Sequence, residues 1–197
     1  MNFYNKIKWV LGILMVFILI ITTNLIDRTN FTQIRDSAVT IYEDRLLAKN
    51  YIFEISKLIH KKELALAKED AAFFKQGNKL INSSIKDYID KFENTKLTTK
   101  ENKVFENFKN DFQNLEESES KFLSNNDNGS KKIESLITKL KTNLDDLSHI
   151  QINEGKRQIS ISEKAISTVE LFTRLEIYIL IFLAIVIQIV VMYTPKK

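Results

Sequence analysis

The sequence predicts an all-α protein: an up-down-up-down four-helix bundle whose first and last helices are continuous with two transmembrane helices. Three observations support this fold class. The 197 residues include one Pro and four Gly, and sheets or loop-rich folds need more of these turn residues. Two long apolar stretches stand near the ends of the sequence. A heptad pattern follows the first stretch without a helix-breaking residue.

The two apolar stretches are the predicted membrane anchors. Residues Trp9 to Ile26 and Ile177 to Tyr193 contain no charged side chain, and each stretch is close to the roughly 20 residues that a spanning helix needs. Two buried core helices are excluded because a chain of this length has no other core large enough to enclose them. A cleaved signal peptide is disfavoured because residues 22–25 (TTNL) are a poor cleavage sequence. We therefore expect two uncleaved anchors in the lipid bilayer.

Basic residues at both ends of the sequence predict its orientation. Lys6 and Lys8 precede the first anchor, and Lys196 and Lys197 follow the second. The positive-inside rule then places both termini in the cytoplasm. We expect a cell (inner) membrane protein with two spans. Its segments are a cytoplasmic N-terminus (1–8), a first span (9–26), an extracytoplasmic four-helix-bundle domain (27–174), a second span (175–193) and a cytoplasmic C-terminus (194–197).

The first predicted bundle helix carries the heptad pattern. We expect one continuous helix from about Trp9 to Lys75, ended by Gln76-Gly77-Asn78 with Gly77 in the left-handed conformation of a helix cap. Its seam alternates steps of four and three residues, which is typical of a helix that packs against others. The seam residues are Ile34, Ala38, Ile41, Arg45, Ala48, Ile52, Ile55, Ile59, Lys62 and Leu66.

Three further helices complete the predicted bundle. The second covers about 79–93, and the third runs to about Ser124 after a capping box formed by Thr98 and Glu101. The stretch 125–130 (NNDNGS) is the clearest loop, and the fourth helix continues from there into the second span. Their seams are Ile81, Ile85, Tyr88 and Phe92; Phe105, Phe108, Phe112, Leu115, Glu119 and Phe122; and Ile133, Ile137, Leu140, Leu144 and Leu147.

Unequal helix lengths predict a dimer. The first and last helices each extend about 45 residues beyond the membrane, about 68 Å, while the two middle helices are nearer 17 and 27 residues. The middle helices therefore cover only the distal part. Seam residues such as Ile34 and Ile41 need another cover, and a second copy supplies it, so we expect a homodimer through the first helix.

Arg45 is an unexpected charge on the apolar seam of the first helix. Equal residue counts from the two membrane boundaries place it level with a polar stretch of the fourth helix, where Gln151, Glu154 and Gln158 interrupt the apolar pattern. We expect a pair between Arg45 and Glu154. One interpretation is a polar layer that fixes helix register; the other is a site for a small anion or carboxylate. The candidate ligand-binding residues are Tyr42, Arg45, Glu154 and Arg157.

Other functions are disfavoured. His60 and His149 are expected about 12 Å apart along the bundle axis, so no metal site is predicted, and no cofactor is expected. The chain lacks a nucleophile–base constellation and a Gly-rich phosphate loop, so we do not expect an enzyme. The net charge of +4 is spread along a chain without a basic block that carries interleaved aromatic residues, which argues against nucleic acid.

A motif around Arg45 is similar to one in a known family. Residues Ile41 to Leu47, IYEDRLL, resemble the first-helix segment of the four-helix-bundle ligand-sensor domain of methyl-accepting chemotaxis proteins. That segment is usually followed by Pro-Leu, where this chain has Ala48-Lys49. The resemblance implies an extracytoplasmic sensor bundle between two spans. Family receptors continue into a HAMP linker and a cytoplasmic coiled coil, whereas only residues 194–197 follow the second span here.

These observations predict a membrane-anchored, chemoreceptor-like sensory module. It would detect an extracytoplasmic signal through Tyr42, Arg45, Glu154 and Arg157, and a piston-like shift of the fourth helix would pass the signal across the membrane. Because no output domain is expected in this chain, a membrane signalling partner would act in trans. The alternative is a structural or scaffolding membrane coiled coil without a ligand.

Overall fold

The computed structural model describes residues 3–70, 72–124 and 129–192, and these ranges are mainly helical and contain no strand. The chain divides into two compact units, one made of the residues up to Ala38 and from Ile159 onwards, the other of Val39–Gln158. The loop residues 125–128 and the tail 194–197, both named in the sequence predictions, lie outside the described residues.

The first unit holds two candidate membrane-spanning helices. They belong to α1 (Phe3–Thr40) and to the last part of α5 (Gly129–Met192). Their most apolar windows have mean hydropathies of 2.3 and 2.0, and only 6% and 0% of these windows is buried. Core helices of a soluble protein would be mostly buried. Ile13, Phe17 and Phe182 are each more than 60% exposed, and contiguous exposed apolar surface of this kind marks an interaction site or a membrane.

The first long helix ends earlier than predicted. α1, the π-helical segment η1 (Ile41–Leu46) and α2 (Leu47–Ala67) follow one another without a break. The chain then turns at residues 68–70, where Glu69 has φ of 52°. Asp70 begins the next segment, because its Oδ1 accepts a hydrogen bond from the Phe73 backbone N–H at 3.0 Å.

The predicted left-handed cap at Gly77 is therefore wrong. Gly77 has φ of −77° and belongs to a second π-helical segment, η2 (Phe73–Gly77). The left-handed position is taken by Glu69 instead. A non-glycine residue tolerates this conformation where the surrounding turn is well hydrogen-bonded, as the backbone bond of 2.9 Å from Asp70 N to Ala65 O shows here.

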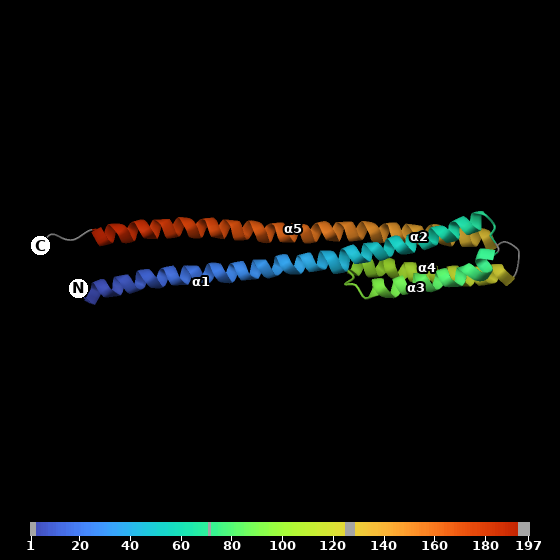
Figure 1. Cartoon of the computed structure of the whole chain (residues 1–197), viewed down its shortest axis with the longest axis horizontal. Helices are drawn as coiled ribbons and strands as arrows, with labels where there is room; N and C mark the ends of the chain where they lie inside the picture. The colour runs from blue at the N-terminus through green and yellow to red at the C-terminus, as the bar shows by residue number, and fades with distance from the viewer. Residues whose placement is uncertain (1–2, 71, 125–128, 193–197) are drawn as a thin grey trace. The chain divides into compact units, whose positions relative to one another are not determined.

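The remaining helices agree with the sequence prediction. They are α3 (Asn78–Glu93), α4 (Thr99–Ser124) and α5, which begins at Gly129. Within the second unit, α2, α3, α4 and the first part of α5 lie side by side (Figure 1) and share one apolar core. This arrangement is a four-helix bundle.

The core of the second unit is built from the predicted seams. Nearly every seam residue between Arg45 and Leu147 is buried, and Phe92 and Phe105 meet with ring centroids 4.7 Å apart. Burying one large apolar side chain contributes about 1.5–3 kcal/mol, so this core stabilises the bundle. Charged seam residues interrupt it at two levels, and these two levels are the candidate sites. The fully buried apolar residues include Ile55, Ile59, Ile85, Phe108, Leu115, Ile133, Ile137, Leu140 and Leu147.

Candidate functional site

The first candidate site begins with the π-helical segment η1. The Leu47 N–H donates to the Tyr42 carbonyl five residues back, so η1 contains one residue more per turn than the helices on either side. π-helical turns occur often at functional sites. η1 coincides with the first six residues of the IYEDRLL motif and holds Arg45, which is 6% exposed, in the core.

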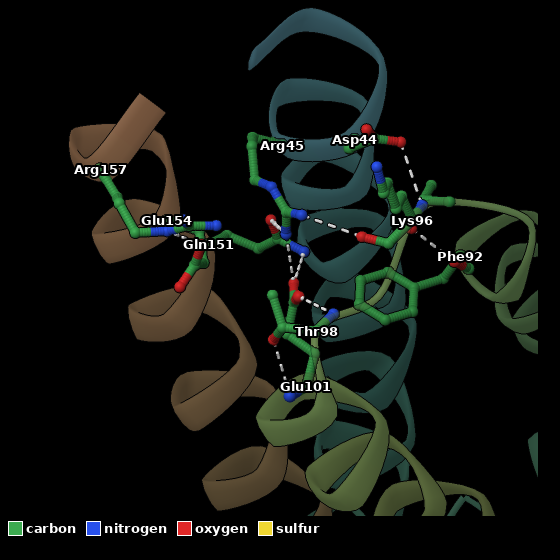
Figure 2. A network of polar contacts seen from close by, with 10 residues as sticks. Asp44, Arg45, Phe92, Lys96, Thr98, Glu101, Gln151, Glu154 and Arg157 are labelled. Atoms are coloured by element: carbon green, nitrogen blue, oxygen red, sulfur yellow. Dashed lines mark hydrogen bonds and ion pairs between the residues drawn. The ribbon is translucent and has the colours of Figure 1, made fainter. Parts of the chain in front are cut away.

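Asp44 and Arg45 bind the backbone N–H and the backbone C=O of one loop residue. The loop joins α3 to α4. Asp44 Oδ1 accepts a hydrogen bond from the Lys96 backbone N–H at 3.0 Å, and Arg45 Nη2 donates to the Lys96 carbonyl at 2.9 Å. Figure 2 shows both contacts. The acidic and basic residues of the motif therefore fix the α3–α4 loop against η1.

Glu101 supplies the countercharge of Arg45. Arg45 Nη1 donates to Glu101 Oε1 at 2.7 Å, and the Glu101 side chain is fully buried. The other carboxylate oxygen accepts the Thr98 backbone N–H at 2.7 Å, while Thr98 Oγ1 accepts the Glu101 backbone N–H at 3.2 Å. This confirms the predicted capping box. One carboxylate thus caps α4 and also neutralises the buried guanidinium.

Gln151 of α5 completes this first site. Its Oε1 accepts from Arg45 Nη1 at 3.1 Å, and its Nε2 donates to Glu101 Oε1 at 2.6 Å. Arg45 Nε is buried and has no hydrogen-bond partner among the described residues. We call Arg45, Glu101, Gln151 and the Lys96 peptide the Arg45 cluster (Figure 2). It joins η1, the α3–α4 loop, α4 and α5.

A second buried charge pair lies at the other end of the core. Lys62 Nζ donates to Glu119 Oε1 at 2.7 Å and to Glu119 Oε2 at 2.9 Å. Asn78 accepts from Lys62 through Oδ1 and donates to Glu119 Oε2 through Nδ2. Asn82 Nδ2 also lies 3.3 Å from Glu119 Oε2. We call Lys62, Asn78, Asn82 and Glu119 the Lys62 cluster.

The Lys62 ammonium is held where water does not reach. Lys62 is 0% exposed and Glu119 is 2% exposed. Burial lowers the pKa of Lys62, because a low-dielectric environment disfavours the charged form, while the nearby carboxylates of Glu119 and Glu116 partly oppose this shift. The hydrogen bonds from Nζ nevertheless match those of an ammonium, which has three donors.

A comparison with known families identifies the chain. A family model described as a four-helix-bundle sensory module for signal transduction matches residues 2–162. The chain belongs to this family. The resemblance inferred from IYEDRLL is thereby confirmed, and the matched range of the sensory module includes both charge clusters. No curated protein and no solved structure shows a significant match to the chain.

The residues predicted to bind a ligand in this sensory module are not all brought together. Arg45 is buried, whereas Tyr42 is 58% exposed. Glu154 Oε2 accepts from Arg157 Nε at 2.7 Å on the surface of α5. Arg45 therefore pairs with Glu101 and not with Glu154, as Figure 2 shows. Counting residues from the two membrane boundaries predicted the polar stretch of α5 that contains Gln151. It could not predict Glu101, because the count compared only the first and last helices and Glu101 lies on α4.

The Lys62 cluster was missed although its signal is visible in the sequence. Lys62 and Glu119 were both placed on apolar seams, and a charge on a buried seam needs a partner of opposite charge. As for metals, His60 Nδ1 lies 3.0 Å from Glu63 Oε2 on the surface of α2. The described part of the chain contains no group of three potential ligands that would hold a metal ion.

Proposed function

We propose that this chain is a membrane-anchored, chemoreceptor-like sensory module that detects an extracytoplasmic signal and passes it across the membrane to a partner protein. The family match over residues 2–162 carries this proposal. The two candidate membrane-spanning helices support the anchoring. Sensory modules of this kind act by conformational change, so no catalytic step is proposed.

The proposed topology has an up-down-up-down bundle outside the cell membrane and both termini in the cytoplasm. Short turns between the helices of the second unit and lysines near both chain ends support it. The chain has no cysteine, so single cysteines report topology cleanly. Ser83→Cys, at an exposed position of α3, should react with a membrane-impermeant maleimide on intact cells, while Lys196→Cys should react only after lysis. The reverse pattern would place the bundle in the cytoplasm.

The proposed responding layer comprises Tyr42, Arg45, Glu154 and Arg157, together with Glu101 and Gln151. Its support is the buried Arg45 Nε, a donor that has no partner among the described residues although polar groups surround it. Such a group costs about 1–3 kcal/mol, which an acceptor on a small anion or carboxylate would recover. The π-helical η1 segment, which places Arg45 there, gives further support.

The melting temperature of the full chain in nanodiscs tests this layer. Small anions, amino acids and organic acids are screened one at a time. A compound that binds the folded state adds about 2.7 kcal/mol at 100 times its Kd. We expect Arg45→Ala to abolish the gain and the control Arg35→Ala, with a side chain 76% exposed, to retain it. If a compound still raises the melting temperature of Arg45→Ala, it binds at another site.

We also propose a homodimer through the first long helix. Its outer face carries Val39, Tyr42, Leu46 and Phe53, each between 46% and 59% exposed. A second copy would bury this apolar stripe. Leu46→Cys should form a disulfide-linked dimer in membranes, and the control Asn110→Cys, on the exposed face of α4, should not. Equal cross-linking at both positions would reject this interface.

One observation favours a second function, a scaffolding membrane coiled coil without a ligand. The Arg45 charge is already neutralised by Glu101 at 2.7 Å, as a pair that only fixes register would be. The double variant Arg45→Met/Glu101→Leu separates the two functions. If it stabilises the bundle and the wild type gains no stability from any screened compound, the scaffold is the better description.

A further inference from the structure

A cavity of about 650 Å³ lies between the two candidate membrane-spanning helices of the first unit. Its walls are formed by α1 from Met15 to Ile26 and by α5 from Phe172 to Leu183. This volume falls in the range of about 300–1,000 Å³ that is typical of small-molecule sites. The two helices therefore leave room for a ligand along this part of their length.

The cavity is mainly apolar and reaches about halfway across a bilayer. Leu19, Ile179 and Phe182 are among its lining residues. Each wall extends about 17 Å along its helix, whereas the hydrocarbon core of a bilayer is about 30 Å thick. The uncharged stretches are bounded by Asp27 and by Glu176, so the cavity begins at the membrane boundary. Its depth therefore matches one leaflet, which is the depth that a single apolar chain occupies.

The boundary end of the cavity is lined by groups that accept hydrogen bonds. These groups are the hydroxyls of Thr22 and Thr23 and the carboxylate of Glu176. Thr22 Oγ1 donates to the Ile18 carbonyl at 2.8 Å, and Thr23 Oγ1 donates to the Leu19 carbonyl at 2.6 Å. A hydroxyl has one hydrogen to donate, and an ionised carboxylate has none. A ligand at this end must therefore supply the donors.

Asp27 adds a second carboxylate at the same end. It lies one turn beyond Thr23 on the same face of α1, and its Oδ1 is buried without a hydrogen-bond partner among the described residues. The Glu176 carboxylate also has no hydrogen bond or ion pair within the described ranges. The adjacent basic residues Arg28 and Arg174 are exposed and form no ion pair with either carboxylate. The boundary end thus presents negative charge that no cation of the described chain neutralises.

We propose that this cavity binds a single-chain amphiphile with a cationic head group. The apolar chain fills the cavity, and the ammonium group donates hydrogen bonds to the carboxylates of Glu176 and Asp27. Such a ligand satisfies both parts of the site, because buried acceptors need donors and an apolar cavity excludes a polar chain. A phospholipid fits less well, since its phosphate would face two carboxylates.

This site is separate from the Arg45 cluster and lies on different residues. It depends on the two candidate membrane-spanning helices and not on the sensory function proposed above. It also keeps its chemistry in either membrane orientation, because the ligand enters from the leaflet that is nearer to Asp27. A failure of the compound screen at Arg45 therefore leaves this proposal standing, and the converse also holds.

Photochemical labelling of the full chain in phosphatidylcholine nanodiscs tests the proposal. The probe is a tetradecylamine that carries a diazirine in mid-chain, and the control is the tetradecanol with the same diazirine. After irradiation, mass spectrometry compares labelling of Ile179, which lines the cavity, with labelling of Ile181, which is 53% exposed. The two residues lie about 3 Å apart in depth, so their ratio corrects for how much of each probe enters the bilayer.

We expect the Ile179-to-Ile181 labelling ratio to be about tenfold higher for the amine than for the alcohol, a factor that one charge-assisted hydrogen bond supplies.

Two pairs of variants locate the site. The double variant Glu176→Gln/Asp27→Asn should lower the ratio for the amine to that for the alcohol, whereas Glu170→Gln, at a side chain 62% exposed on α5, should leave it unchanged. Leu19→Trp should lower the ratio for the amine because it fills the cavity. Its control Ile20→Trp, at an exposed position outside the lining, should not.

Three results would overturn the proposal. Equal ratios for amine and alcohol in the wild type would show that ordinary lipid fills the cavity. Failure of both probes to label Ile179 above Ile181 would show that another helix, such as that of a second copy, closes it. A preference for the amine that persists in Glu176→Gln/Asp27→Asn would show that these carboxylates do not recognise the head group. Circular dichroism of each variant confirms unchanged helix content.

Discussion

The Arg45 and Lys62 clusters are two buried ion pairs between the same two helices, yet their surroundings differ. The Arg45 cluster lies at a π-helical turn, contacts a loop peptide, includes α5 and keeps a buried donor without a partner among the described residues. The Lys62 cluster is closed to water, and its carboxylate is surrounded by amide and ammonium donors from α2 and α3. Its Asn82 Oδ1 is also buried without a hydrogen-bond partner among the described residues.

This difference indicates two roles for buried charge in one core. An ion pair that is closed to water and held within the helices fixes their register, and breaking it is costly. An ion pair that also hydrogen-bonds to a neighbouring helix and to a loop couples the positions of these elements. We therefore assign register to the Lys62 cluster and coupling to the Arg45 cluster, and the following variants test that division.

Removal of Lys62 should have the largest effect on stability. Lys62→Met leaves the Glu119 carboxylate buried without its countercharge, and loss of one partner of a buried pair costs about 3–5 kcal/mol. Urea unfolding of the full chain in detergent, followed by circular dichroism, measures this loss. The control Lys57→Met, whose side chain is 50% exposed, should change stability by less than about 1 kcal/mol. Equal losses would show that Lys62 is not buried as described.

Glu101→Gln should have the next largest effect. The amide oxygen can replace Oε1 as the acceptor for Arg45 and Gln151, but the amide NH2 then replaces Oε2 and cannot accept the Thr98 backbone N–H. The countercharge and one hydrogen bond of the capping box are therefore lost, while the guanidinium keeps its contacts with Lys96 and Gln151. We expect the free energy of unfolding to fall by about 2–3 kcal/mol in the same assay. This is more than the loss of one neutral hydrogen bond costs and less than the loss of one partner of a buried ion pair. A loss larger than that of Lys62→Met would contradict the division of roles.

Thr98→Ala tests the capping box without touching the charge pair. The Thr98 hydroxyl accepts the Glu101 backbone N–H, and loss of such a cap costs about 1 kcal/mol. Thr99→Ala, at an exposed neighbouring position, is the matched control and should be nearly neutral. Equal effects of the two substitutions would argue against the box.

The smallest expected effect is pH-dependent and lies on the surface. Hydrogen bonds, first from Lys141 and then from His60, lower the pKa of Glu63. The unfolded state then binds more protons than the folded state, so the stabilisation is present above the ordinary carboxyl pKa and is lost as pH falls through the lowered one.

Glu63→Gln should therefore cost less than about 1 kcal/mol at pH 7, and the difference from wild type should be smaller at about pH 4, just below the ordinary carboxyl pKa. Unfolding curves at both pH values measure it, and Glu117→Gln, at an exposed position of α4, controls for the charge change. If the stability difference between wild type and Glu63→Gln grows as pH falls, the pKa of Glu63 is not lowered in the folded state.

Much of the fold follows from sequence because helical periodicity is local. The seams of α3, α4 and α5, the Thr98–Glu101 box and the polar level on α5 were all predicted from spacing. The turn at Glu69 was not, because a left-handed glutamate has no distinctive sequence signal and Gly77 is a stronger candidate.

The charge pairs depend on how the first long helix, with η1 and α2, packs against α4. Arg45 and Glu101 are 56 positions apart in sequence and Lys62 and Glu119 are 57 apart, so no local pattern joins them. The π-helical turn also rotates Arg45 relative to an unbroken α-helix. The sequence thus identified Arg45 as unusual, but only the packed bundle identifies its partner.

Double-mutant cycles at both pairs test the central claim, that buried ion pairs join the first long helix to α4 at two levels. Arg45→Met with Glu101→Leu, and Lys62→Met with Glu119→Leu, each give a coupling energy from four unfolding curves of the full chain. We predict about 2 kcal/mol or more for both pairs, near the upper end of the range for residues in contact. Coupling below about 0.5 kcal/mol at either pair, the value of an exposed surface pair, would contradict the account.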